Sequence, residues 1–217
     1  MDSIIGLRYN GGVLLASDTN NARSILVYQH DIDKISQLTP HSMIGLSGPN
    51  CDLVNFSEFV EKNLTMYRLK NGDTLSTSGI ANYCRSELAT ALRKGPFQVN
   101  TLLGGWDAET KKTVNGVEKV DGPGVGSLYY IDYMGTMSPV NYGCQGYCSN
   151  FVLSVLDREW HEGLSKEEAL EIISHCEQVL KKRFLVDQGV FGVKKVDKEG
   201  VGVVRDCKGN LENLAAA

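Results

Sequence analysis

The side chains that most often carry out catalysis are few and scattered in this sequence. A Ser-His-Asp or Cys-His group can assemble in space from distant residues, but no GxSxG-type turn accompanies any serine. His175 lies beside the apolar positions of an expected helix, where a packed or half-exposed histidine is more common than a general base. The four histidines are His30, His41, His161 and His175.

The six cysteines do not have the spacing of a metal site. None forms a CxxC pair or stands near a histidine at zinc-finger spacing. Cys144 and Cys148 lie four apart and could share a helix face, but two thiolates make half a zinc site at best. We therefore expect no metal or cofactor, and reduced thiols that act as small buried hydrophobic side chains: Cys51, Cys84, Cys144, Cys148, Cys176 and Cys207.

Two short motifs partly match the patterns of a phosphate-binding loop and of a glycosylation acceptor. The run Gly122-Pro123-Gly124-Val125-Gly126 lacks the lysine and the strand-to-helix setting of a phosphate-binding loop, so we interpret it as a hairpin tip. Asn63-Leu64-Thr65 matches a glycosylation acceptor, yet it falls within a predicted helix of a chain that shows no export signal. Neither motif indicates a function.

The composition argues against several classes of partner. Charged residues are 22% of the 217 residues and the net charge is -4, so the basic excess of nucleic-acid-binding proteins is missing. The sequence has no run of about 18 apolar residues and no signal-peptide pattern, from which we expect no membrane partner and a location in cytoplasm and nucleus. The length fits a single domain, which we place at residues 1–206, with a C-terminal tail at 207–217.

The first half of the sequence predicts strands and then two helices. Strands are expected at residues 3–9, 13–18, 25–28, 34–38 and 42–46, as one sheet built from neighbours, with a tight turn at Asn10-Gly11-Gly12. Apolar residues then recur at helical spacing from Leu53 until Asn71-Gly72. A second helix begins at Ser76 or Ser78 and ends at Gly95-Pro96, and the short loop between the two helices favours an antiparallel pair.

The second half repeats this order. Strands are expected at residues 97–107 and 127–133, separated by 108–126, a charged and glycine-rich stretch that we interpret as an extended surface hairpin loop. A third helix is predicted at 147–160, a capping box from Ser165 to Glu168 opens a fourth, and a hairpin at 190–205 closes the chain. The pattern predicts the α+β class, a four-layer αββα sandwich of two antiparallel sheets flanked by helix pairs.

Several segments together resemble the beta-type subunits of the proteasome core particle, which have the Ntn-hydrolase fold of the threonine-peptidase family. IIGLRYNGGVLLASDTNN, HDIDKIS with Lys34, and GLSGPNCD match in order and spacing. Further on, FQVNTLLGGWD, SLYYIDYMGTM, YGCQGYCSNFVLSVLDREW and LKKRF are similar to the non-catalytic subunit at the beta-four position. The resemblance spans nearly the whole chain, although 108–126 is longer than the family pattern and the C-terminal end is unmatched.

The resemblance implies a test for catalysis. Active members use an N-terminal threonine whose hydroxyl attacks the peptide carbonyl and whose free α-amine acts as the base. Placing Gly6, Asp18 and Lys34 on the family pattern puts Asp2 at the nucleophile position, and a carboxylate cannot make that attack. A cut after a glycine that precedes Thr, Ser or Cys is possible only from residue 126 onward, where it would remove more than half of the chain.

Two more positions of the catalytic group are degenerate in this alignment. The Gly-Ser-Gly turn of working subunits becomes Gly146-Tyr147-Cys148, and the acidic partner after the fourth helix is replaced by Phe184, which accepts no hydrogen bond. Asp18 and Lys34 remain. In active relatives they tune the protonation of the threonine, but here we favour a structural remnant, a charge pair that holds the first strands together.

The resemblance therefore implies a structural subunit without catalysis of its own. It would join other proteasome alpha and beta subunits in a stacked four-ring hetero-oligomer and support ubiquitin-dependent protein degradation by catalytic neighbours. From the length of the loop at 108–126 within an otherwise compact domain, we expect that this loop contacts another subunit. One alternative is an active N-terminal-nucleophile peptidase of the same fold, and another is a free-standing interaction protein. Subunit contacts and core packing are equally consistent with the aromatic and methionine residues Met66, Tyr67, Tyr129, Tyr130, Tyr133, Phe151 and Trp160.

Overall fold

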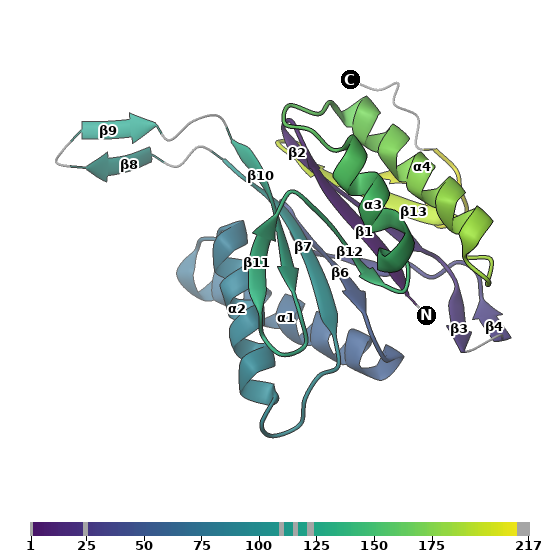
Figure 1. The fold of residues 1–217 in the computed structure, drawn as a ribbon. Coiled ribbons are helices and arrows are strands. Elements are labelled where there is room, and N and C mark those ends of the chain that lie inside the picture. Colours follow the sequence, from purple (N-terminus) through teal and green to yellow (C-terminus); the bar gives the residue numbers. More distant parts are fainter. Residues whose placement is uncertain (1, 24–25, 109–110, 115–116, 121–123, 212–217) are drawn as a thin grey trace.

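The computed structural model describes residues 2–23, 26–108, 111–114, 117–120 and 124–211 (Figure 1). The first round of elements consists of β1 (Ser3–Tyr9), β2 (Gly12–Asp18), β3 (Asn21–Arg23), β4 (Leu26–Gln29), β5 (Ile35–Thr39), β6 (Ser42–Ser47), α1 (Asn50–Asn71) and α2 (Thr77–Ala91). The second round consists of β7 (Asn100–Asp107), β8 (Lys111–Val114), β9 (Val117–Val120), β10 (Val125–Ile131), β11 (Met137–Val140), β12 (Tyr142–Gly146), α3 (Ser149–Glu159), α4 (Lys166–Arg183), β13 (Phe191–Asp197) and β14 (Gly200–Arg205).

Two five-stranded antiparallel sheets form the centre of the molecule. One has the order β12-β1-β2-β13-β14, and the other has the order β11-β10-β7-β6-β5. The last hairpin therefore pairs with the first, with Phe191 opposite Asp18. The prediction of one sheet built from neighbours is wrong for three strands. β4 pairs with β3 in a separate two-stranded sheet, and β5 pairs with β6, which in turn pairs with β7 in the other five-stranded sheet. Side-chain alternation specifies the two faces of a strand but not its partner.

Buried side chains fall into three apolar layers around these sheets. One layer lies between the sheets, where β1 and β2 contribute Ile4 and Leu15 and the opposite sheet contributes Met43 and Leu102. A second layer joins α1 and α2 to one sheet, and a third joins α3 and α4 to the other. Figure 1 shows the two helix pairs on opposite sides of the sheets. The predicted α+β, four-layer αββα fold is confirmed.

The helix ends follow local sequence signals. Gly72 ends α1 in the left-handed region, at φ 73°, and its N–H donates to the Arg68 carbonyl at 2.8 Å. The capping box predicted for α4 is present, with Ser165 and Glu168 bonding reciprocally. Ser76 caps α2, which ends at Ala91, before the predicted Gly95-Pro96 stop.

The segment before the third helix differs from the prediction. The helix begins at Ser149 rather than at residue 147, and two strands, β11 and β12, precede it. Both are edge strands that carry proline or glycine, so they lack the β-branched alternation that identifies inner strands. Cys144 lies on β12 and Cys148 is the N-cap residue of α3, so the expectation that they could share a helix face is wrong.

The expectation that all cysteines are buried is correct in part. Cys84, Cys144, Cys148 and Cys176 are buried free thiols, whereas Cys51 is exposed and Cys207 is half-buried. Burial raises the pKa of the Cys84 and Cys176 thiols to about 12, which keeps them neutral.

Within the predicted surface loop at 108–126, the described residues include an antiparallel pair, β8 with β9. Figure 1 shows this pair apart from the two sheets. Residues 109–110, 115–116 and 121–123 of the loop lie outside the described residues, as do residues 212–217 of the tail. Among the helices that the structure describes, none combines the length and the apolar character needed to cross a bilayer.

Candidate functional site

Three of the residues singled out from the sequence meet in one ion-pair cluster. Lys34 Nζ lies 2.9 Å from Asp2 Oδ1 and 2.8 Å from Asp18 Oδ2. Asp2 precedes β1, Asp18 ends β2, and Lys34 directly precedes β5. The chain therefore brings together a cation from one sheet and two carboxylates from the other. We call Asp2, Asp18 and Lys34 the Lys34 cluster.

Backbone groups complete the bonding of each charged side chain. Lys34 Nζ also donates to the Asn20 carbonyl at 2.8 Å, so all three of its donors are used. Asp18 Oδ1 accepts the Ser3 N–H at 2.7 Å. Asp2 Oδ2 accepts the Gly48 N–H at 3.2 Å. The three charged groups are thus held by one another and by the main chain.

The Lys34 cluster is removed from water to different degrees. The exposed fraction of the side chain is 7% for Lys34, 2% for Asp18 and 11% for Asp2. Burial raises the pKa of the Asp18 carboxyl above its ordinary value, because the charged form loses its hydration, and the Asp2 charge adds to this effect. The Lys34 ammonium and the Ser3 N–H oppose the rise by stabilising the carboxylate.

Two glycines allow neighbouring turns to close around Asp2. Gly146 pairs with Ser3 across β12 and β1, and a Cβ at Gly146 would stand 1.8 Å from the Asp2 carbonyl oxygen. A Cβ at Gly48 would stand 2.2 Å from the Gln98 carbonyl oxygen. Any side chain at either position would displace backbone, so both glycines are required for this geometry.

Tyr147 and Phe184 lie outside the Lys34 cluster. The Tyr147 side chain is 60% exposed and lines a surface groove with Asn150 and Leu153. Phe184 is the C-cap residue of α4, and its ring packs edge-on against Phe151 at a centroid distance of 5.7 Å. In the described part of the chain, no hydrogen bond or ion pair joins either side chain to the cluster.

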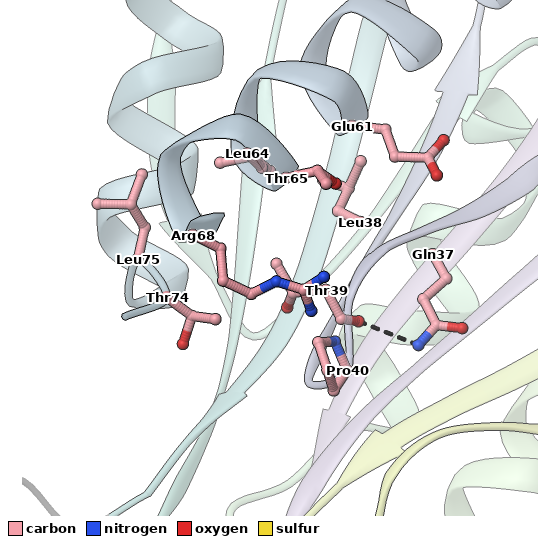
Figure 2. A pocket seen from close by; sticks show the side chains of 10 residues that line it. All are labelled: Gln37, Leu38, Thr39, Pro40, Glu61, Leu64, Thr65, Arg68, Thr74 and Leu75. Atoms are coloured by element: carbon pink, nitrogen blue, oxygen red, sulfur yellow. Dashed lines mark hydrogen bonds between the residues drawn. The ribbon is translucent and has the colours of Figure 1, made fainter. Parts of the chain in front are cut away.

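A separate polar hollow of about 350 Å³ lies between the β5–β6 turn and the C-terminal half of α1. Figure 2 shows Glu61 and Arg68 of α1 facing Gln37 and Thr39, and Gln37 Nε2 donates to the Thr39 carbonyl at 3.1 Å. This hollow shares no residue with the Lys34 cluster, and we assign it no function.

Comparison with known proteins identifies the family. Residues 2–196 match the proteasome subunit family. The chain belongs to this family. It is 40% identical over 200 residues to "Proteasome subunit beta type-2-B" of Arabidopsis thaliana, covering 92% of this chain and 94% of the relative. It is 36% identical over 208 residues to "Proteasome subunit beta type-4" of Saccharomyces cerevisiae, covering 95% and 98%. The predicted resemblance to proteasome beta-type subunits is confirmed.

Three residues of this proteasome subunit's site were not singled out as site residues from the sequence. Ser3, Asn20 and Gly48 each contribute a backbone N–H or carbonyl. Backbone groups are common to nearly all residue types, so residue identity does not reveal them. The Ser47-Gly48-Pro49 break before the first helix was the available signal, since a glycine at such a turn indicates close approach of the backbone.

Among the residues that the structure describes, the partners of Lys34 Nζ in this proteasome subunit are the Asp2 and Asp18 carboxylates and the Asn20 carbonyl, and none is a hydroxyl or a thiol. Two histidines singled out from the sequence have other partners: His30 Nδ1 lies 3.0 Å from Asn20 Oδ1, and His175 Nδ1 lies 2.9 Å from Glu159 Oε2. Across the described residues, no three His, Cys, Asp or Glu side chains are grouped to hold a metal ion. The bonds that the Lys34 cluster makes are therefore ion pairs and hydrogen bonds to the main chain.

Proposed function

We propose that this chain is a non-catalytic structural subunit of the beta ring of a proteasome core particle. The observation that carries the proposal is the bonding of Asp2. At the position that the family pattern gives to the nucleophile, the side chain is a carboxylate that accepts from Lys34 Nζ and from the Gly48 N–H. A carboxylate in two such bonds cannot replace the threonine hydroxyl of an active subunit.

Two further substitutions support the absence of catalysis. Tyr147 and Phe184 stand where the family pattern has a hydroxymethyl group and an acidic side chain, and the bonds of the Lys34 cluster involve neither of them. On this proposal, Asp18 and Lys34 are remnants with a structural role. They bond to each other, Lys34 also bonds to Asp2 and to the Asn20 carbonyl, and Asp18 also accepts the Ser3 N–H.

The names of the relatives support a place in the beta ring. Fungal relatives are named beta type-4, which agrees with the beta-four position. The partners would be other alpha and beta subunits of the stacked particle, and the role would be support of ubiquitin-dependent degradation by catalytic neighbours in cytoplasm and nucleus.

Exposed apolar side chains offer a surface for contact with these subunits. Helix α1 carries four of them: Val54, Phe59, Met66 and Leu69. Residues 1–206 would form the single domain, and the 108–126 hairpin would touch a neighbouring subunit.

Native mass spectrometry of the tagged endogenous chain, with peptidase assays on the lone chain and on its complex, tests the proposal. We expect the chain in a particle of several subunits that is active while the lone chain is inert. Peptidase activity of the lone chain, or a trimmed chain with Thr, Ser or Cys as its first residue, would instead support the active N-terminal-nucleophile peptidase.

A further inference from the structure

The Asp2 carboxylate fills a small site made of two converging donors. The Lys34 ammonium binds Oδ1 at 2.9 Å, and the Gly48 N–H binds Oδ2 at 3.2 Å. An ammonium and a backbone N–H directed at the two oxygens of one carboxylate form a donor set suited to carboxylates and oxyanions.

These two donors are held in place by contacts other than Asp2. Lys34 Nζ is fixed by Asp18 and by the Asn20 carbonyl, both at 2.8 Å. Gly48 directly follows Ser47, the last residue of β6, which pairs with Asn100 of β7, so the end of the sheet positions the Gly48 N–H. The site is therefore preorganised, and both donors would remain in position without the Asp2 side chain.

We propose that Asp2 is a built-in ligand that keeps this carboxylate-binding site closed, and that the same donors bind a free carboxylate when the Asp2 side chain is removed. The ligand class is a small carboxylate or the C-terminal carboxylate of a peptide. Access is from the Asp2 side, because its side chain is 11% exposed whereas that of Asp18 is 2% exposed.

The closure has a purpose in the assembly, and this part of the inference rests on the proposed function. Catalytic neighbours hydrolyse peptide bonds, so each cut releases a peptide with a new C-terminal carboxylate. A vacant ammonium and N–H pair in the same particle would retain such products. An internal carboxylate prevents this by mass action, because its effective concentration at the site exceeds that of free peptide.

Chemical rescue with sodium acetate tests the inference on the full-length chain. Asp2→Ala vacates the site, whereas Asp2→Asn keeps the side chain's volume but removes its charge. In acetate we expect the Tm of Asp2→Ala to rise by about 2–4 °C over its value in sodium chloride of equal ionic strength. Wild type and Asp2→Asn should show no difference between the two salts.

An absent response in Asp2→Ala, or an equal response in wild type, would overturn the inference. If Asp2→Ala is not recovered folded, refolding yields in the two salts replace the Tm, and equal yields contradict the proposal while a higher yield in acetate supports it. Peptidase activity of the lone wild-type chain would refute the proposed function without changing the acetate response, so the two failures are distinguishable.

Discussion

The Lys34 ammonium lies 2.8 Å from the Asp18 carboxylate and thereby joins the two sheets of the sandwich. Asp18 ends β2 in one sheet, and Lys34 precedes β5 in the other. Both side chains are more than nine-tenths buried. A charge pair in this position registers one sheet against the other, in addition to the apolar layer between them.

Removal of the Lys34 ammonium should strongly lower the free energy of unfolding. Lys34→Met leaves two buried carboxylates without their counter-ion, and loss of one partner of a buried pair typically costs about 3–5 kcal/mol. Urea denaturation of wild type and variant measures the change in the free energy of unfolding. Lys62→Met is the matched control, because its pair with Glu58 is exposed and should contribute less than about 1 kcal/mol. Equal losses in the two variants would contradict the structural role of Lys34.

The raised pKa of Asp18 predicts a pH dependence of stability. A group whose pKa is higher in the folded state contributes stability that is fully present below its unfolded pKa and is lost as the pH rises through its folded pKa. Asp18→Asn removes this titration. The stability of wild type minus that of Asp18→Asn should therefore fall as the pH rises above the ordinary carboxyl pKa of about 4, as measured by denaturation at each pH. A difference that grows with pH would show that Lys34 outweighs burial.

Buried and exposed thiols should differ in reactivity. The exposed Cys51 is expected to react with iodoacetamide in the native chain, whereas Cys84 and Cys176 react only after unfolding. Burial excludes the reagent and raises the pKa of both thiols to about 12, which removes the reactive thiolate. Mass spectrometry of the labelled peptides gives the rates, and labelling of Cys84 as fast as that of Cys51 would contradict the packing of α2.

Local signals explain why the helices were predictable. Gly72 ends α1 and the pair of Ser165 and Glu168 begins α4, and each signal acts within a single turn of the chain. The sheets were less predictable, because the pairing of β6 with β7 joins residues more than fifty positions apart in the sequence. Strands β11 and β12 lacked a strong pattern because each is an edge strand with one partner.

The charged side chains of the candidate site could be found from the sequence, whereas its backbone donors could not. Asp2, Asp18 and Lys34 were singled out through the family resemblance, since their spacing in sequence carries no signature of an ion-pair cluster. That Asp2 bonds to Gly48 depends on the turn between β6 and α1 reaching the N-terminal residues, which is a consequence of how the two sheets stack. The backbone donor of Gly48 was therefore identified only when the structure showed which segments lie next to each other.

Gly146→Ala tests whether the close approach of β12 fixes Asp2. A Cβ would stand 1.8 Å from the Asp2 carbonyl oxygen, and the backbone at Gly146 has φ +86°, which alone costs an alanine about 1 kcal/mol. Gly163→Ala is the matched control, because Gly163 has φ +85° and a Cβ there meets no atom within 4 Å. We expect Gly146→Ala to lose at least about 1 kcal/mol more than Gly163→Ala in urea denaturation, because Asp2 must move away from Lys34. Equal losses would mean that the strained φ explains both variants and that the turn before α3 does not position Asp2.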